Sequence, residues 1–153
     1  MDATTYRPVN ERFELRLSPS PAAPAAARGA LGPLRGAVDE DTFSSVELLV
    51  SELVSNAVRH AGLRNEEWIE LRVEASEDHV RVSVTDPGDG FDPALEIPRP
   101  DRPSGWGLFL VRRLAARWGI ERGRETLVWF EIARRGSPAH SAGELGVRQR
   151  TSG

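Results

Sequence analysis

The sequence contains no cysteine and no lysine, and these two absences exclude several classes of protein at once. Without cysteine the chain can form no disulfide, no thiolate metal site and no cysteine nucleophile. All 20 basic residues are arginine, which excludes a Walker-type phosphate loop and a kinase of the common eukaryotic type, since both place a lysine on the nucleotide phosphates. Lysine Schiff-base chemistry is excluded for the same reason. Any nucleotide site in this chain must therefore use magnesium, backbone amides and arginine.

The chain also lacks long apolar runs and a strong net charge. No stretch approaches the roughly 18 apolar residues that cross a bilayer, and the polar segment 1–10 has no signal-like apolar core. We therefore expect a cytoplasmic protein without membrane contact, and the formal net charge of -3 gives no reason to expect direct nucleic-acid binding. Length and composition favour one domain over 11–135, between a flexible N-terminus at 1–10 and a disordered tail at 136–153.

The spacing of apolar residues predicts a series of strands and helices. Alternating apolar and polar side chains predict four strands, at 11–17, 68–75, 79–86 and 126–133. Helical spacing predicts a long helix over 43–61, capped by Asp41 or Thr42, and a shorter one over 106–118. The apolar face of the shorter helix would consist of Leu108, Val111, Leu114 and Ala115. An alanine-rich segment near Pro21 predicts a further, weaker helix.

The order of these elements indicates a fold class. A hairpin around Gly123 adds a strand before 126–133, so the order is strand, helix, helix, strand, strand, loop, helix, strand, strand. This order predicts a two-layer α/β (α+β) sandwich, in which a mostly antiparallel mixed sheet carries helices on one face. Strands 68–75 and 79–86 are too close in sequence for a crossover connection, which excludes a parallel doubly wound fold.

A polar ridge runs along the predicted long helix beside its apolar stripe. Glu52, Asn56 and His60 are spaced four apart, so they lie on one side of the helix at the edge of the core. The carbonyl oxygen of Asn56 is a hard neutral ligand that suits magnesium, and Glu52 could accept a proton from an attacking hydroxyl or water. Taken alone, this spacing is more typical of an ordinary polar helix flank, and His60 suits a structural role at the helix end.

A carboxylate and two glycines follow the strand 79–86. Period-two geometry turns Asp86 to the same side as the valines of that strand, towards the helices. A carboxylate on a buried face requires a hydrogen-bond donor, which could be the amino group of adenine, a neighbouring arginine or a backbone amide. Gly88 and Gly90 would let the backbone turn tightly and leave room for a ring. By itself this motif also fits a simple turn at a strand end.

The third motif is Gly105-Trp-Gly107-Leu108, where a predicted helix begins after a proline-rich loop. The free amides and the positive dipole end of a helix favour phosphate, and glycines let a phosphate chain approach the backbone closely. A helix cap with a flexible hinge explains the motif equally well when it stands alone.

In this order, the three motifs resemble the nucleotide site of the GHKL ATPase superfamily, which has the Bergerat ATP-binding fold. The segments 51–61, 105–111 and 128–131 look most like the branch of anti-sigma-factor serine/threonine kinases, which carry a histidine-kinase-like ATPase domain. The resemblance spans roughly residues 10 to 133 and implies ATP and Mg²⁺ as ligands.

The resemblance implies a role for each matching residue. Glu52 would be the catalytic base, Asn56 the magnesium ligand and Asp86 the partner of the adenine amino group. Thr126 would hold the water that bridges threonine, aspartate and adenine in this superfamily. The smaller residues would shape the pocket: Gly88 and Gly90 around the base, and Gly105, Gly107 and the Leu108 amide around the phosphates.

Residues 91–104 would form the lid over the triphosphate. Arg99 and Arg102 are the basic residues of this segment that could reach a terminal phosphate. Solvated loop arginines are the alternative explanation for both.

The resemblance also implies partners. The substrate of such a kinase is an anti-sigma-factor antagonist, phosphorylated on serine or threonine, and the same protein sequesters a sigma factor, usually as a homodimer. A different possibility is a regulatory module that binds ATP and a partner without turnover. The catalytic half of a histidine kinase would need a dimerisation helix pair with an acceptor histidine, and the 42 residues before Phe43 leave little room for one.

Overall fold

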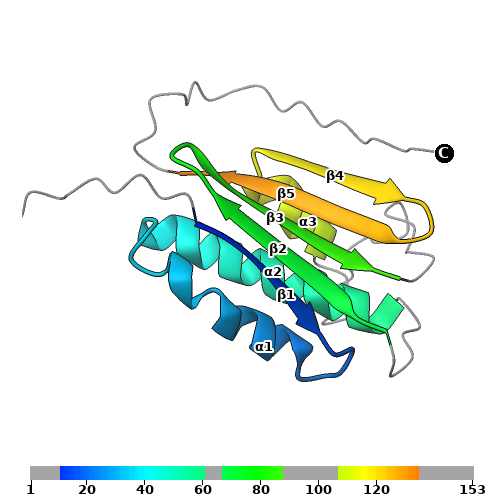
Figure 1. Ribbon diagram of the computed structural model, residues 1–153. Helices are drawn as coiled ribbons and strands as arrows, with labels where there is room; N and C mark the ends of the chain where they lie inside the picture. The colour runs from blue at the N-terminus through cyan, green and yellow to red at the C-terminus, as the bar shows by residue number, and fades with distance from the viewer. Residues whose placement is uncertain (1–10, 61–66, 88–106, 135–153) are drawn as a thin grey trace, which may run out of the picture.

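The computed structural model describes residues 11–60, 67–87 and 107–134, and the segments 1–10 and 136–153 with their predicted flexibility lie outside this part (Figure 1). Its elements are, in chain order, β1 (Glu11–Leu17), α1 (Ala23–Ala30), the 3-10 turn η1 (Gly32–Leu34), α2 (Glu40–His60), β2 (Ile69–Ala75), β3 (His79–Asp86), α3 (Gly107–Leu114), β4 (Arg117–Arg122) and β5 (Thr126–Ala133).

The strands form one sheet in the order β1-β2-β3-β5-β4. Every neighbouring pair among the described strands is antiparallel. The helices cover one face of this sheet and leave the other face open (Figure 1). The predicted two-layer sandwich is confirmed, and the sheet is antiparallel throughout the described residues.

The covered face is built by the period-two pattern of the strands. β3 and β5 alternate strictly between buried and half-buried residues, so every second side chain enters the layer between sheet and helices. The core of this layer includes Phe130, Leu71 and Val82, all fully buried. The predicted bounds of β1, β3 and β5 are confirmed.

Helix α2 begins earlier than the sequence predicted. Its first turn is capped by Asp39, whose carboxylate accepts hydrogen bonds from the Thr42 backbone N–H at 3.0 Å and from the Thr42 hydroxyl at 2.6 Å. The prediction of Asp41 or Thr42 as the cap is therefore wrong. Both residues lie inside the first turn, where Asp41 is exposed and Thr42 is buried.

Helix α3 ends at Leu114, four residues before the predicted end at Trp118. Trp118 belongs to β4, where it pairs with Phe130 of β5 and is 3% exposed. Val111, Ala115 and Trp118 keep helical spacing along the sequence, which is why the pattern predicted one continuous helix. Leu114, predicted on the apolar face of the helix, is instead 40% exposed.

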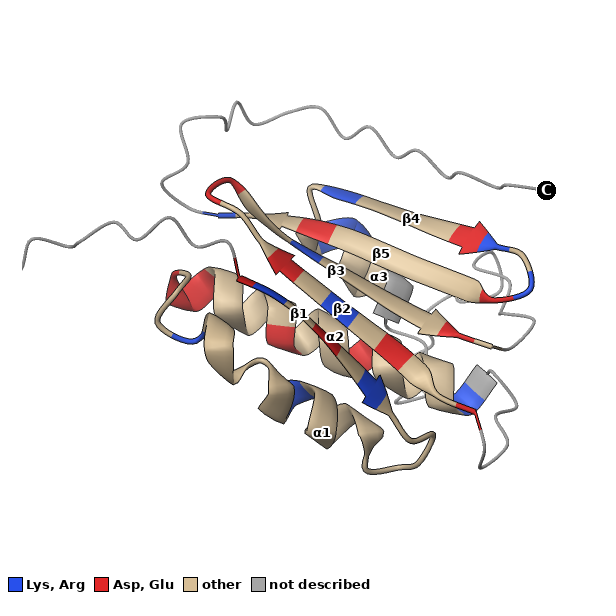
Figure 2. Ribbon diagram, in the orientation of Figure 1, with Lys and Arg blue, Asp and Glu red and all other residues tan. Residues whose placement is uncertain are grey.

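The open face of the sheet carries paired charges (Figure 2). Arg12 pairs with Glu74 across β1 and β2, and Arg72 pairs with Glu70. Further along, Trp129 lies over Gly119, and a Cβ built at that glycine would come 2.6 Å from the Trp129 Nε1 atom. Glycine is thus required at 119 by the close approach of the indole ring.

Arg134 fastens one end of the sandwich. Its side chain donates to the backbone oxygens of Ser76 at 2.6 Å and Ala37 at 2.9 Å, and its backbone N–H donates to Asp78 at 2.9 Å. These contacts tie the end of β5 to the β2–β3 turn and to the segment before α2. They lie at the end of β3 that is opposite to Asp86.

Candidate functional site

Four polar side chains are buried within the described residues, and three of them were predicted as site residues. The four are Thr42, Asn56, Asp86 and Thr126, with exposures of 3%, 1%, 4% and 1%. Thr42 is accounted for by its hydrogen bond to the helix cap. Burial of a polar group is costly unless it is hydrogen-bonded, so buried polar side chains are the first residues to consider for a role in a site.

Asp86 and Thr126 lie directly opposite each other on neighbouring strands. The antiparallel register of β3 and β5 makes them Cα partners, at the last residue of one strand and the first of the next. Both side chains face the layer between sheet and helices, as their burial shows. The structure therefore brings together an aspartate and a threonine whose shared face, but not whose pairing, could be read from the sequence.

Helix α2 brings Glu52 and Asn56 to the same layer. It packs against β3, β5 and α3, with Asn56 buried and Glu52 half-buried one turn earlier. His60 is the last residue of this helix. The C-terminal end of α2 lies at the end of the sheet where β2 begins and β3 ends, which is the end that carries Asp86 (Figure 1).

The amide of Asn56 is only partly satisfied. Its Oδ1 accepts a hydrogen bond from Arg59 Nη2, whereas its buried Nδ2 has no hydrogen-bond partner among the described residues. An unpaired buried donor costs about 1–3 kcal/mol, so such a group is typically retained for a ligand or a rearrangement. Arg59 was missed in the sequence; its position three residues after Asn56 on one helix was the available signal.

Of the residues predicted to bind the phosphates, the structure describes only Gly107 and Leu108. Gly107 and Leu108 open the first turn of α3, where backbone N–H groups have no partner within the helix. Other predicted residues lie outside the described part, namely Gly88, Gly90, Arg99, Arg102 and Gly105.

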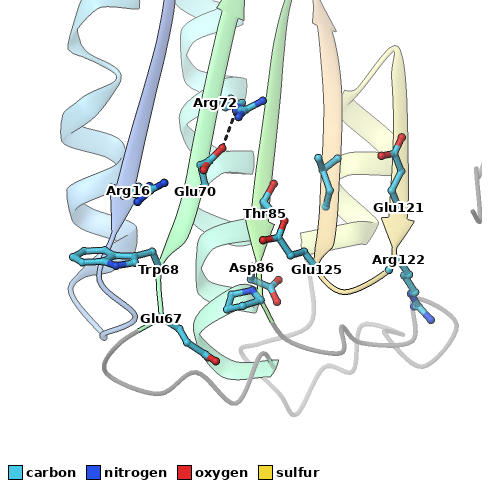
Figure 3. A pocket seen from close by; sticks show the side chains of 13 residues that line it. Arg16, Glu67, Trp68, Glu70, Arg72, Thr85, Asp86, Glu121, Arg122 and Glu125 are labelled. Atoms are coloured by element: carbon cyan, nitrogen blue, oxygen red, sulfur yellow. Dashed lines mark ion pairs between the residues drawn. The ribbon is translucent and has the colours of Figure 1, made fainter.

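A large pocket of about 630 Å³ opens elsewhere, on the helix-free side of the sheet (Figure 3). Its walls include Glu70, Arg72 and Glu121, which point away from the covered layer, and Asp86 borders it from one edge. Asn56, Glu52 and Thr126 are not among its lining residues. Of the three buried polar side chains, this charged pocket therefore meets only Asp86, and its size alone gives it no claim to be the nucleotide site.

The described residues contain no cluster of three or more histidine, cysteine, aspartate or glutamate side chains that could hold a metal. In the same part of the chain, no helix combines the length and the apolar character needed to cross a membrane.

Comparison with known proteins bears on the family of the chain. A family model described as a histidine kinase-like ATPase domain matches residues 17–132. The chain is 32% identical over 93 residues to the serine-protein kinase RsbW of Staphylococcus epidermidis, covering 52% of this chain and 58% of the relative. RsbW of Staphylococcus aureus matches with the same identity and coverage. The chain thus spans 58% of the length of these curated relatives, and the resemblance to the GHKL superfamily and its anti-sigma-factor kinase branch is confirmed.

Proposed function

The chain belongs to the family of histidine kinase-like ATPase domains, and from this premise we propose that it is a Mg-ATP-dependent serine/threonine protein kinase of the anti-sigma-factor type. The observation that carries this proposal is the burial of Asn56, Asp86 and Thr126 at one end of the sandwich. Its partners are an anti-sigma-factor antagonist, which it phosphorylates, and a sigma factor, which it sequesters as a homodimer. The likeness to RsbW serine-protein kinases supports this choice of branch.

Asp86 recognises the base in this proposal. Its carboxylate accepts a hydrogen bond from the exocyclic amino group of adenine, and Thr126, its partner in the register, holds a bridging water. Gly88 and Gly90 shape the base pocket beyond the end of β3. The burial of both side chains supports this role, because a carboxylate and a hydroxyl in a water-poor layer discriminate strongly between ligands with and without a donor.

Asn56 holds the metal in this proposal, and the structure offers a suitable atom. Its Oδ1 is a neutral hard oxygen that already accepts a hydrogen bond from a cationic group. Magnesium, when bound there, neutralises charge that develops on the transferring phosphate. Gly105, Gly107 and the amide of Leu108 hold the phosphate oxygens, and residues 91–104 close over them, with Arg99 and Arg102 in reach of the terminal phosphate.

Glu52 is the general base. It lies one turn before Asn56, about 6 Å away along the helix axis, and its half-buried position gives it access to an incoming side chain. It takes the proton of the serine or threonine hydroxyl as that oxygen bonds to the γ-phosphorus, while the bond from that phosphorus to the bridging oxygen of ADP breaks. The phosphorylated partner and ADP are the products.

The test is transfer of label from γ-labelled ATP to a purified antagonist protein. Glu52→Ala is expected to reduce transfer at least about 100-fold and to leave ATP affinity within about twofold, since a general base acts only in the chemical step. The matched control is Glu47→Ala, on the same helix and also half-buried but about two and a half turns from Asn56. Transfer by Glu52→Ala at the unaltered rate would show that the base is misassigned. Co-purification of the antagonist without any transfer by the unaltered protein would favour a binding module.

A further inference from the structure

The Arg59–Asn56 contact places a positive charge on the oxygen assigned to the metal. Arg59 Nη2 donates to Asn56 Oδ1, with the two residues three positions apart on α2. Asn56 is 1% exposed, whereas Arg59 is exposed. The guanidinium of an exposed residue thus contacts the oxygen of a buried amide.

This contact also sets the orientation of the amide. If the Asn56 side chain rotated by half a turn, its Nδ2 would face Arg59 Nη2, and two donors would oppose each other. The observed orientation keeps Oδ1 towards the cation and leaves Nδ2 in the interior, where it has no partner among the described residues. Arg59 therefore selects the orientation in which the oxygen is available to a positively charged ligand.

We propose that Arg59 occupies the magnesium position of the nucleotide-free protein and is displaced when magnesium arrives with the nucleotide. This inference rests on the proposed function, which makes Asn56 Oδ1 the metal ligand. Two cations cannot share one carbonyl oxygen without strong mutual repulsion, so entry of the metal requires the guanidinium to leave. Nucleotide alone brings no competitor for Oδ1 and leaves the contact in place.

Two arginines of the neighbouring helix α3 contact aromatic rings. Arg112 lies over the Trp118 ring at 5.4 Å, and Arg113 lies over the Phe109 ring at 5.5 Å. Arg59 has no such ring contact among the described residues. Because it is exposed, the displaced side chain can swing into water with little loss of packing. Replacement of the Arg59 guanidinium by magnesium at Asn56 Oδ1 then makes the affinity for the nucleotide depend on the magnesium concentration.

The direct measurement is the Arg59 guanidinium NMR signal, assigned by its absence from the spectrum of Arg59→Met. A non-hydrolysable ATP analogue with magnesium is expected to shift this signal to the position of a solvated arginine, whereas the analogue with a chelator is expected to leave it unchanged. The same shift without metal would overturn the proposal, because the side chain would then be responding to phosphate. No shift with the magnesium complex, while calorimetry shows it bound, would also overturn it.

The second measurement is the magnesium concentration that produces half of the metal-dependent gain in analogue affinity. Arg59→Met removes the competing cation but keeps the aliphatic stem, so this concentration is expected to fall about fivefold, the equivalent of one net hydrogen bond. The matched control is Arg117→Met, which removes the same charge from an exposed position on β4. An unchanged or higher concentration in Arg59→Met would contradict displacement. If the analogue fails to bind with or without metal, the proposed function itself fails.

Discussion

The two faces of the sheet handle polar side chains differently. On the open face, arginines and glutamates on neighbouring strands pair with one another, as Arg12 does with Glu74, and both partners remain largely exposed. On the covered face, at the end of β3, Asp86 and Thr126 are almost fully buried, and the nearby helix contributes Asn56, whose Nδ2 group has no hydrogen-bond partner among the described residues. Charged side chains on the open face are thus paired near solvent, whereas the covered face buries the polar side chains to which the proposed function assigns the nucleotide.

One matched substitution on each face tests most directly whether the covered face, and not the open face, binds ATP. Asp86→Asn is expected to weaken ATP binding about 30-fold, because a hydrogen bond to a buried charged group is worth about 2 kcal/mol. Glu70→Gln, on the open face at the same end of the sheet, is expected to change affinity less than twofold, since its ion pair with Arg72 is partly exposed. Calorimetry with each variant decides; equal losses in both would mean that the nucleotide occupies the open pocket instead.

A second substitution separates stability from binding. Gly119→Ala places a methyl group 2.6 Å from the Trp129 indole, so the ring must move and the protein is expected to lose about 2 kcal/mol of unfolding free energy. ATP affinity is expected to stay unchanged, because the contact lies on the open face. Thermal and urea unfolding measure the loss, and adding Trp129→Val should remove most of it. A loss that persists in the double variant would contradict a steric origin.

The smallest expected effect is a gain in stability, from a substitution at Asn56. Asn56→Leu replaces the half-satisfied amide by an apolar group of similar size, and the nucleotide-free protein is expected to gain about 1 kcal/mol of unfolding free energy. The same change is expected to remove the effect of magnesium on nucleotide affinity. Denaturant unfolding without nucleotide measures the first effect. A clear loss of stability would show that Asn56 serves the fold rather than a ligand.

The sequence predicted best where one periodicity acted alone. The alternation in β3 and β5 located both strands and turned Asp86 and Thr126 towards the helices. The end of α3 was wrong because Ala115 and Trp118 satisfy a helical spacing and a strand at once, and pairing with β5 decides between them. Such pairing is a tertiary contact that short-range patterns do not contain.

The candidate site shows the same limit. The residue types and their order predicted which side chains to examine, and the structure places Asn56, Asp86 and Thr126 in the buried layer. The pairing of Asp86 with Thr126 depends on the strand order, which no local motif specifies. The spacing of Arg59 from Asn56 allowed the contact but could not predict it, because an exposed arginine on a helix has many rotamers and the spacing selects none of them.

The hydrogen bonds of Arg134 should make the two ends of the domain differ in local stability. The Arg134 side chain joins the end of β5 to the β2–β3 turn and to the segment before α2, so it holds these elements together at this end of the sheet. Asp86 and Thr126 lie at the opposite end of the sheet. Thermal motion should thus separate the sheet from the helices first near those two residues. Hydrogen exchange of the backbone amides should be slowest near Arg134.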